Sequence, residues 1–331
     1  MPLLLNEADV KAIFTMPLAL EAVEDSFRRL TQGSILVQPR RRLNIPGQSY
    51  LHYMAAADSS AGYMGLKIYT SSREGLRFLI PLFDAQSGDL LALIEGDYLG
   101  QMRTGAASGV ATKFLARQDA RTVGIAGTGL QARTQLEAVA QVRKIESVRA
   151  YSRDAQKRAA FAREMSERLK ISVSAVDSAE WAVRDADIVI TATTSTEPVV
   201  NGAWLAPGTH INAIGANFPH KRELDNAAVE RADLIVVDFC EQARMEAGDL
   251  IHVLGEEASR WAHVLELAEI VAGKIPGRTH ARQITLFKSS GIASEDVVSA
   301  GRVYELARQR RMGKEVAMWQ KESRSAQGRS L

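Results

Sequence analysis

Hydrophobic positions follow two different patterns along the 331 residues of this chain. From about residue 121 onward, short apolar runs alternate with longer stretches that have the periodicity of amphipathic helices. Fully apolar strands separated by helices are typical of a parallel sheet covered on both faces, and right-handed crossovers make such a sheet doubly wound. The expected strands are TVGIAG (122–127), SVRAYS (147–152), ISVSAV (171–176), DIVITAT (187–193), THINAIG (209–215), DLIVVDF (233–239) and QITLFKS (283–289).

The first part of the chain has a different pattern. An amphipathic segment at 17–30 predicts a helix, and the turn sequence DAQSGDL (84–90) favours antiparallel pairing of its flanking strands. A last amphipathic helix at 293–311 is expected to return to these strands. The extended stretches of this part are 41–56, 63–70, 77–85 and 89–99. We therefore predict two α/β domains: a Rossmann-type parallel-sheet domain over residues 118–296, and a smaller mixed α/β domain built from residues 1–117 and 297–331.

Composition narrows the function classes. The net charge of +2 and the lack of an aromatic-basic motif argue against nucleic acid as a partner. No apolar run approaches the length of a membrane span, and the opening residues lack the basic leader of a signal peptide. Cys240 is the only cysteine, which fits a reducing compartment, and the histidines are not spaced as metal ligands. We expect a soluble cytoplasmic protein that has no metal site and no membrane partner.

The segment GTGLQA (127–132) carries the first chemical signal. It fits the G-x-G-x-x-G/A pattern directly after an expected strand and at the start of an expected helix, so it predicts a dinucleotide site. Gly127 permits the tight turn, Gly129 lets the backbone approach a pyrophosphate, and Ala132 lets the helix lie close to the strand. The other turn residues expected to contact the cofactor are Thr128, Leu130 and Gln131.

The end of the next strand bears on the choice of cofactor. An acidic residue there would hold the ribose 2′-hydroxyl of NAD, whereas this chain has Ser152 and Arg153, with Lys157 and Arg158 one turn later. A hydroxyl and a guanidinium are ligands for a 2′-phosphate, although a basic helix start is also common as a solvated surface. The sequence therefore favours NADP(H), and Asp154 keeps NAD(H) open.

Beyond this turn, the chain resembles the ornithine cyclodeaminase/mu-crystallin family, which includes archaeal-type alanine dehydrogenases and ketimine reductases. The resemblance covers almost the whole chain. It implies dinucleotide-dependent chemistry on a small imino-acid or amino-acid substrate, and a homodimer formed through the smaller domain. The segments that carry it are GLKIYT (65–70), GDYLGQMRTGAASGVATKFLA (96–116), GTGLQA (127–132), INAIGANFPHKRELD (211–225) and LFKSSGIASEDV (286–297).

The resemblance gives roles to three basic residues. Lys67 matches a lysine that contacts the substrate carboxylate or imine and takes part in proton transfer. Arg103 and Thr104 match a pair at a helix start that touches cofactor phosphate and an active-site carboxylate. Arg40, which follows a proline, matches an arginine bidentate to the substrate carboxylate, and Arg42 has the strand parity to replace it. Without the resemblance, Lys67 would be interpreted as a solvated lysine on a strand and Arg103 as part of an ion pair between domains. Arg40 would be one of three solvated charges that protect an edge strand from pairing.

Two positions depart from the cyclodeaminases of the family. Where cyclodeaminases and the related alanine dehydrogenase have an aspartate that shuttles a proton, this chain has Asn217, whose amide orients groups but carries no proton at neutral pH. Ketimine reductases of mu-crystallin type also lack an acid there. Where cyclodeaminases hold an acid for the distal amine of ornithine, this chain has His52. His52 either contacts the substrate or is a strand histidine whose hydrogen bonds are made by a neighbouring residue. Both departures argue against cyclisation of ornithine.

The matched segments imply further contacts. Thr193 ends an expected strand on the cofactor side of the sheet, and Gly215 ends another. Lys221 matches a lysine that contacts the cofactor. Ser289 and Ser290 match the turn that faces the nicotinamide, with Ser290 also near the substrate.

The expected reaction is hydride transfer from NAD(P)H to the C=N carbon of an α-imino acid or cyclic ketimine, whose reverse is amino-acid dehydrogenation. In this scheme Arg40 holds the carboxylate and Lys67 assists protonation, while Arg103 stabilises charge and Asn217 orients the imine or a water. Two alternatives stay open. One is a lyase that cyclodeaminates a basic amino acid with bound NAD, and the other is a protein that binds NADPH and a small ligand without turnover.

Overall fold

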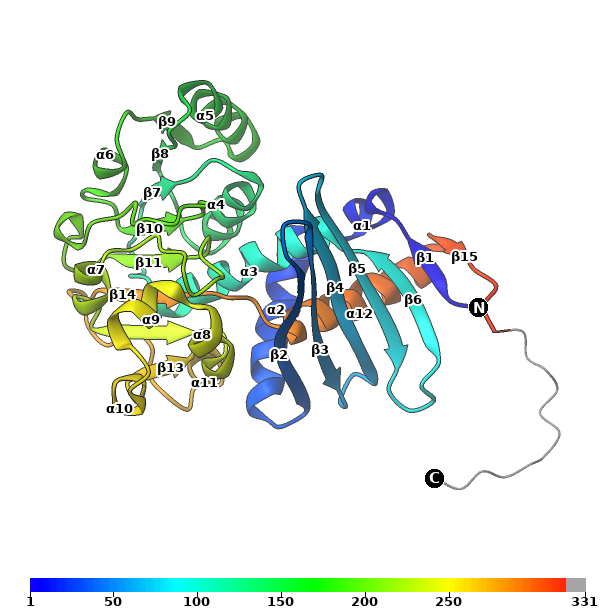
Figure 1. Cartoon of the computed structure of the whole chain (residues 1–331). Coiled ribbons are helices and arrows are strands. Elements are labelled where there is room, and N and C mark those ends of the chain that lie inside the picture. The colour runs from blue at the N-terminus through cyan, green and yellow to red at the C-terminus, as the bar shows by residue number, and fades with distance from the viewer. Residues whose placement is uncertain (320–331) are drawn as a thin grey trace.

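Two β-sheets organise the chain, and they lie side by side in Figure 1. The computed structural model describes residues 1–319. Sheet A has seven strands in the order β15-β1-β6-β5-β4-β3-β2. Sheet B has eight strands in the order β13-β12-β14-β11-β10-β7-β8-β9.

Sheet B is parallel throughout. Its strands are β7 (Thr122–Ala126), β8 (Ser147–Tyr151), β9 (Ser172–Ala175), β10 (Ile188–Thr191), β11 (His210–Ala213), β12 (Leu234–Val237), β13 (Val264–Glu266) and β14 (Thr285–Lys288). All seven expected strands are present, and β13 is an addition. The central strands β10, β11 and β14 are fully buried, as a sheet covered on both faces requires. The predicted doubly wound fold is confirmed.

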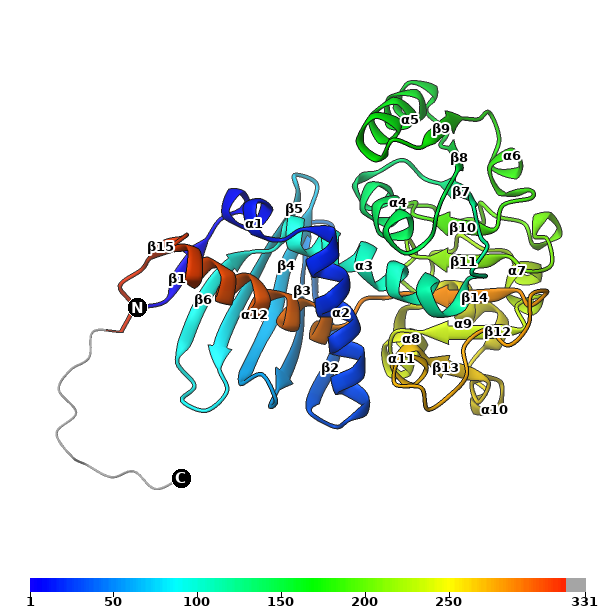
Figure 2. The same ribbon diagram turned by 180° about the vertical axis from the view of Figure 1, so that it is seen from behind.

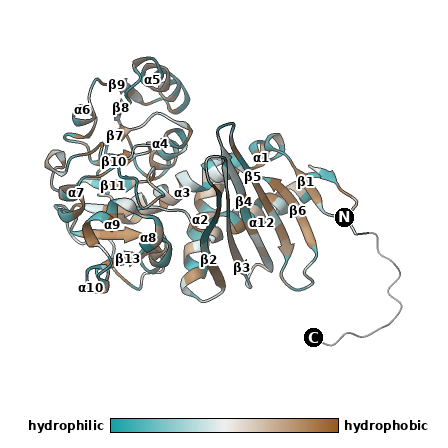
Figure 3. Ribbon diagram, in the orientation of Figure 1, coloured by the Kyte–Doolittle hydropathy of each residue, from teal (hydrophilic) through white to brown (hydrophobic). Residues whose placement is uncertain are grey.

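Helices cover both faces of sheet B. Ile188 and Ile190 of β10 pack in one apolar cluster, whereas Val189, on the opposite face, packs in another. Figure 3 colours α10, at the periphery, as hydrophilic. The helices around this sheet are α4 (Leu130–Val142), α5 (Ala155–Leu169), α6 (Ala179–Val183), η1 (Gly202–Trp204), α7 (Asn226–Glu230), α8 (Cys240–Glu246), α9 (Gly248–Leu254), α10 (Ala258–Trp261) and α11 (Leu267–Val271).

Sheet A is mixed, because β1 pairs with β6 in parallel and every other pairing is antiparallel. Its strands are β1 (Leu3–Leu5), β2 (Ile35–Ile45), β3 (Ser49–Asp58), β4 (Tyr63–Ser72), β5 (Gly75–Asp84), β6 (Leu90–Glu95) and β15 (Lys314–Glu315). The antiparallel pairing expected across the 84–90 turn is confirmed. The β2 ladder is irregular between Gln38 and Arg41, where Pro39 has no N–H to donate, and Arg40 there is buried.

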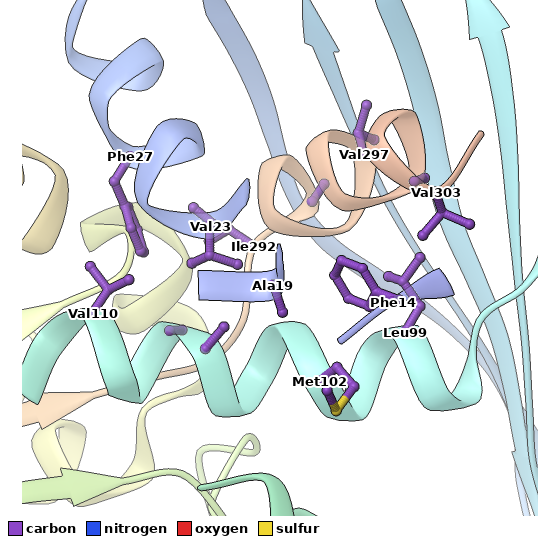
Figure 4. Packing of buried hydrophobic residues seen from close by; sticks show 14 of the residues in the cluster. Phe14, Ala19, Val23, Phe27, Leu99, Met102, Val110, Ile292, Val297 and Val303 are labelled. Atoms are coloured by element: carbon purple, nitrogen blue, oxygen red, sulfur yellow. The ribbon is translucent and has the colours of Figure 1, made fainter. Parts of the chain in front are cut away.

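Four helices complete the structure: α1 (Glu7–Ile13), α2 (Met16–Thr31), α3 (Asp97–Leu115) and α12 (Ala293–Arg310). Figure 2 shows α2 and α12 covering one face of sheet A, and Figure 1 shows the other face uncovered. Val23, Met102 and Val297 belong to the core that these helices share (Figure 4). One expectation was wrong: α3 begins at Asp97, so Arg103 lies in its second turn rather than at its start.

The division of the chain into residues 1–117 with 297–331 and residues 118–296 stays a prediction. Helix α12 contacts α2, β2, β3 and β4, which agrees with its expected return to the first part of the chain. Residues 320–331 of that segment lie outside the described residues. Within residues 1–319, no helix combines the length and apolar character that crossing a membrane requires.

Candidate active site

The carboxyl ends of four neighbouring strands of sheet B meet at one edge. In doubly wound sheets, ligands bind in the crevice outside these strand ends. The predicted site residues that follow the strands are, in sheet order, Ser289 after β14, Gly215 after β11, Thr193 after β10 and Gly127 after β7.

A cavity of about 570 Å³ lies between this edge and sheet A. It brings together most of the residues that the sequence predicted: Arg40, His52, Lys67, Arg103, Thr104, Gly129, Leu130, Gln131, Thr193, Gly215, Asn217, Lys221, Ser289 and Ser290. The predicted residues outside its lining are Gly127, Thr128, Ala132, Ser152 and Arg153, all at the ends of β7 and β8 or in α4. Residues from both sheets therefore face one space.

The glycine turn after β7 has the shape that a dinucleotide needs. Gly127 has φ +109°, and a Cβ there would collide with the carbonyl oxygen of Ala192. Gly129 caps α4, and a Cβ there would meet nothing within 4 Å, so the helix start is open to a ligand. Gln131 lines the cavity with a buried Oε1 that has no hydrogen-bond partner among the described residues. These residues fit the pyrophosphate of a dinucleotide.

The structure at the end of β8 gives Asp154, the acidic residue that left NAD(H) possible as the cofactor, a structural role. Asp154 is the N-cap of α5, and its Oδ1 accepts the backbone N–H groups of Gln156 and Lys157. Ser152 accepts a hydrogen bond from the Thr128 hydroxyl at 2.9 Å, which places it against the glycine turn. Arg153 is exposed and forms no ion pair with any residue that the structure describes. The cap therefore accounts for Asp154 without a ribose contact.

Lys67 and Arg103 form a buried group with two acids of α12. Lys67 Nζ lies 3.1 Å from Oδ1 of Asp296, and Arg103 Nε donates to the same oxygen at 2.9 Å. Arg103 Nη1 also donates to Glu295 Oε2 at 2.7 Å. Burial and the nearby Arg103 charge lower the pKa of Lys67 to about 8. Lys67 can therefore give up or accept a proton near neutral pH, as an acid–base group must.

The first turn of α12 thus holds two acids that the sequence reasoning missed. Burial raises the pKa of Glu295 to about 8. Although burial alone would lower the pKa of Arg103, the charges of Asp296 and Glu295 raise it, so Arg103 stays a cation. The signal in the sequence was two adjacent acids at the start of an expected helix, a pattern that favourable interaction with the helix dipole also explains.

Arg40 and Arg42 converge on a third acid, Glu246 of α8, which the sequence reasoning also missed. Both guanidinium groups form ion pairs with the fully buried Glu246 carboxylate. Arg40 Nη2 also donates to the carbonyl oxygen of Ser290 at 2.9 Å, and its backbone N–H to Gln242 at 2.6 Å. This network joins β2 to the turn after β14 and to α8, so it fixes Arg40 at the cavity wall.

Aromatic rings form one wall of the cavity. His52, Tyr69 and Phe78 face one another across β3, β4 and β5, because these residues are direct cross-strand partners. The His52 and Tyr69 rings stack at 4.2 Å between centroids, and the Tyr69 and Phe78 rings at 4.9 Å. The wall presents a flat apolar surface beside the Lys67 ammonium, which lies 5.3 Å from the Phe78 centroid.

His52 has a neighbour that satisfies it, and its contact with substrate stays a prediction. Its Nε2 lies 3.0 Å from the Ser71 hydroxyl, and its ring also lines the cavity. Burial and the charges of Arg42 and Arg40 lower the pKa of His52 to about 4, so the ring is neutral at physiological pH. Asn217 lines the cavity as well, and its backbone carbonyl oxygen accepts from Arg42 at 3.0 Å.

The fold and the cavity together define a dinucleotide-dependent oxidoreductase. The chain belongs to the ornithine cyclodeaminase/mu-crystallin family, whose model matches residues 1–311. The resemblance inferred from the sequence motifs is thus confirmed.

Three proteins illustrate what this chain is similar to. It is 39% identical to Delta(1)-pyrroline-2-carboxylate reductase of Bacillus cereus over 262 residues, which span 76% of this chain and 80% of that protein. The structure of the Thermococcus litoralis enzyme of that name, in complex with NADH and L-proline, has a TM-score of 0.91 at 40% identity and covers 95% of this chain and 100% of that one. An archaeal alanine dehydrogenase dimer with bound NAD has a TM-score of 0.90 at 34% identity, covering 96% of this chain and 99% of that one.

Proposed function

We propose that the protein reduces the C=N bond of a cyclic α-imino acid with NAD(P)H, and that the reverse reaction oxidises the corresponding amino acid. The observation that carries this proposal is the position of Lys67 and Arg103 in one cavity with the glycine turn and with Ser289. The nicotinamide, when bound, supplies the hydride. The similar reductases named above support the same reaction class.

The residues of this chain divide the remaining work. Lys67 donates the proton that the imine nitrogen takes up when its carbon receives hydride. Arg40 and Arg103 provide positive charge for the substrate carboxylate, and Asn217 orients the imine through its amide. These groups come from β2, β4, α3 and the loop after β11, and their convergence on one cavity would position substrate against the edge of sheet B.

The aromatic wall favours a cyclic substrate over an open-chain one. A ring that contains C=N is nearly flat and can lie against the stacked rings of Tyr69 and Phe78, which bury its apolar carbons. Among the described residues, Asp97 at the start of α3 is the one carboxylate that lines the cavity. A distal ammonium group, as in ornithine, would have to be held there.

Oxidation of NADH and NADPH should be followed with pyrroline-2-carboxylate, piperideine-2-carboxylate, iminosuccinate, and pyruvate with ammonia or methylamine. Ornithine should be tested in parallel by ammonia release. We expect the highest kcat/KM with one of the two cyclic imines. Ammonia release from ornithine without net cofactor turnover would support a lyase instead, and cofactor binding with no turnover on any substrate would support a ligand-binding protein.

For the cofactor, our proposal is a preference for NADPH over NADH. Ser152 and Arg153 offer a hydroxyl and a guanidinium suited to a 2′-phosphate, and the N-cap role of Asp154 removes the main argument for a ribose contact. The two solved relatives described above contain NADH and NAD, so the proposed preference for NADPH rests on the β8 end of this chain alone.

Arg153→Ala is expected to weaken NADPH binding by about tenfold or more, the value of one lost hydrogen bond to a charged group, and to leave NADH affinity nearly unchanged. Fluorescence titration of each cofactor measures this. Arg163→Ala, which removes an exposed arginine further along α5, is the matched control. Equal losses for both cofactors at position 153 would contradict the assignment.

We also propose that the protein is a homodimer that pairs through the uncovered face of sheet A. Leu43 lies opposite Leu51, and Tyr53, Ile68 and Leu79 continue across the next strands on the same face. Leu43 is 60% exposed and Tyr53 40% exposed. A contiguous apolar face of this kind is typical of a subunit interface rather than of a solvated surface.

Leu51→Asp, in the middle of this face, should convert the dimer to a monomer, because it buries a charge without a partner at the interface. Light scattering coupled to size exclusion measures the mass. Trp181→Asp is the control, since Trp181 is 62% exposed on α6, away from sheet A. A monomeric wild-type protein, or a dimeric Leu51 variant, would contradict the proposed interface.

A further inference from the structure

The first turn of α12 inserts two carboxylates between sheet A and α3. Glu295 and Asp296 are both fully buried. Burying an anion is costly unless it is paired, and removing one partner of such a pair leaves an uncompensated charge. The partners here are Lys67 and Arg103, the two basic residues that the proposed reaction uses.

Asp296 is the member that connects these two residues. Its Oδ1 receives both the Lys67 ammonium and the Arg103 Nε, whereas Glu295 contacts only Arg103. The three residues come from β4, α3 and α12, which are distant in the sequence. One oxygen atom therefore fixes the spacing between the ammonium and the guanidinium.

The surrounding backbone is shaped to leave room for both cations. Gly100 lies on α3, about one helical turn before Arg103. A Cβ there would lie 3.2 Å from Lys67 Nζ. A Cβ at Gly291, which has φ +76°, would lie 2.8 Å from Arg103 Nη1. Larger residues at these two positions would crowd the ends of both cations, so the two glycines leave room for this arrangement.

We propose that Asp296 is the positioning residue of this site: it holds Lys67 and Arg103 in one arrangement, and its negative charge keeps Lys67 protonated for donation to the imine nitrogen. This role rests on the proposed reductase function. Asp296 itself acts through Lys67.

The charges that face Lys67 come from several elements. Arg103 of α3 and Arg40 of β2 are cations that favour loss of its proton, and burial acts in the same direction. Asp296 opposes them and raises the pKa of Lys67. His52 on β3 is neutral, Tyr69 lies on β4 with Lys67, and Glu295 pairs with Arg103. Removal of the Asp296 charge therefore leaves the ammonium facing two cations in a buried cavity.

The test is the titration midpoint of Lys67 in free enzyme labelled with ¹⁵N-lysine, with its resonance assigned through Lys67→Arg. In Asp296→Asn, which keeps the volume and an oxygen acceptor, the midpoint should fall by about one to three units. Glu295→Gln, the control from the same helical turn, should shift it less. A midpoint that is unchanged in Asp296→Asn would overturn the proposal.

Kinetics provides a second readout that a merely structural role would not give. The pH at which the rate of imine reduction declines should move downward in Asp296→Asn by the same amount as the midpoint, with a larger effect on kcat than on KM. If Asp296→Asn does not fold, as judged by circular dichroism, Asp296→Ser removes the same charge from a smaller side chain.

The two proposals can fail separately. The NMR titration needs no substrate, so it tests Asp296 even if the wild-type enzyme reduces none of the imines. In that case the reductase function fails while the coupling between Asp296 and Lys67 is still measured. Conversely, an active enzyme in which Asp296→Asn shifts neither the midpoint nor the pH profile retains its proposed function and loses only the role of Asp296.

Discussion

Lys67→Ala is expected to lower kcat for imine reduction by about 10²–10⁴-fold, the contribution of a positioned general acid. The Lys67 ammonium lies 5.3 Å from the Phe78 ring centroid, and no other lysine shares its contacts with Asp296 and Phe78 among the described residues. Cofactor affinity should stay nearly intact, because the glycine turn that binds pyrophosphate lies on sheet B. Stopped-flow hydride transfer and fluorescence titration measure the two quantities.

The pH dependence of the wild-type enzyme shows in which direction of the reaction Lys67 acts as an acid and in which as a base. Because the pKa of Lys67 is lowered to about 8, the ammonium form is present below that pH and disappears as pH rises through it. Imine reduction should therefore decline above about pH 8, whereas amino-acid oxidation, which needs the neutral amine as base, should increase. Lys67→Arg keeps the positive charge but has no proton to give near neutral pH, so it should be nearly as slow as Lys67→Ala.

The strands of sheet B were predictable because each is an apolar run between turn signals. Strand β13 was missed, because Val264–Glu266 is short and contains no such run. The start of α3 was misplaced for a different reason. This helix is buried on nearly every side, so no amphipathic period marks where it begins.

The candidate site was predictable only where a residue follows a local motif. Alternation along β4 puts Lys67 and Tyr69 on one face, and both are buried on that side of the strand. Asp296 could not be assigned in this way, because its contact with Lys67 spans 229 residues and that with Arg103 spans 193. The wall of His52, Tyr69 and Phe78 likewise depends on strand register, which a single sequence does not specify.

A further buried ion pair supports the loop that carries Asn217. Lys288, at the end of β14, lies 3.2 Å from Asp249, and both are fully buried. Lys288 also donates to the carbonyl oxygen of Ala216 at 2.6 Å. Asp249 in turn accepts the backbone N–H groups of Glu223 and the residue after it. The loop between β11 and α7 is therefore held from both ends by one lysine–aspartate pair.

Lys288→Met is expected to lower the free energy of unfolding by about 3–5 kcal/mol, because it leaves the Asp249 charge buried without its cation. Urea denaturation followed by circular dichroism measures this. Lys157→Met is the matched control: its ion pair with Asp154 is long, at 3.8 Å, and exposed, so its loss should change the free energy of unfolding little.

The double variant Lys288→Met/Asp249→Asn separates the charge from the packing. If the uncompensated carboxylate causes the loss, neutralising Asp249 should recover part of the stability that Lys288→Met removes. A double variant that is less stable than Lys288→Met by the full cost of Asp249→Asn would show that the two residues act independently. Imine reduction by the same variants should also be measured. If Lys288→Met slows imine reduction and the double variant recovers stability but not this rate, the Lys288 hydrogen bond to Ala216 holds Asn217 in its position at the cavity.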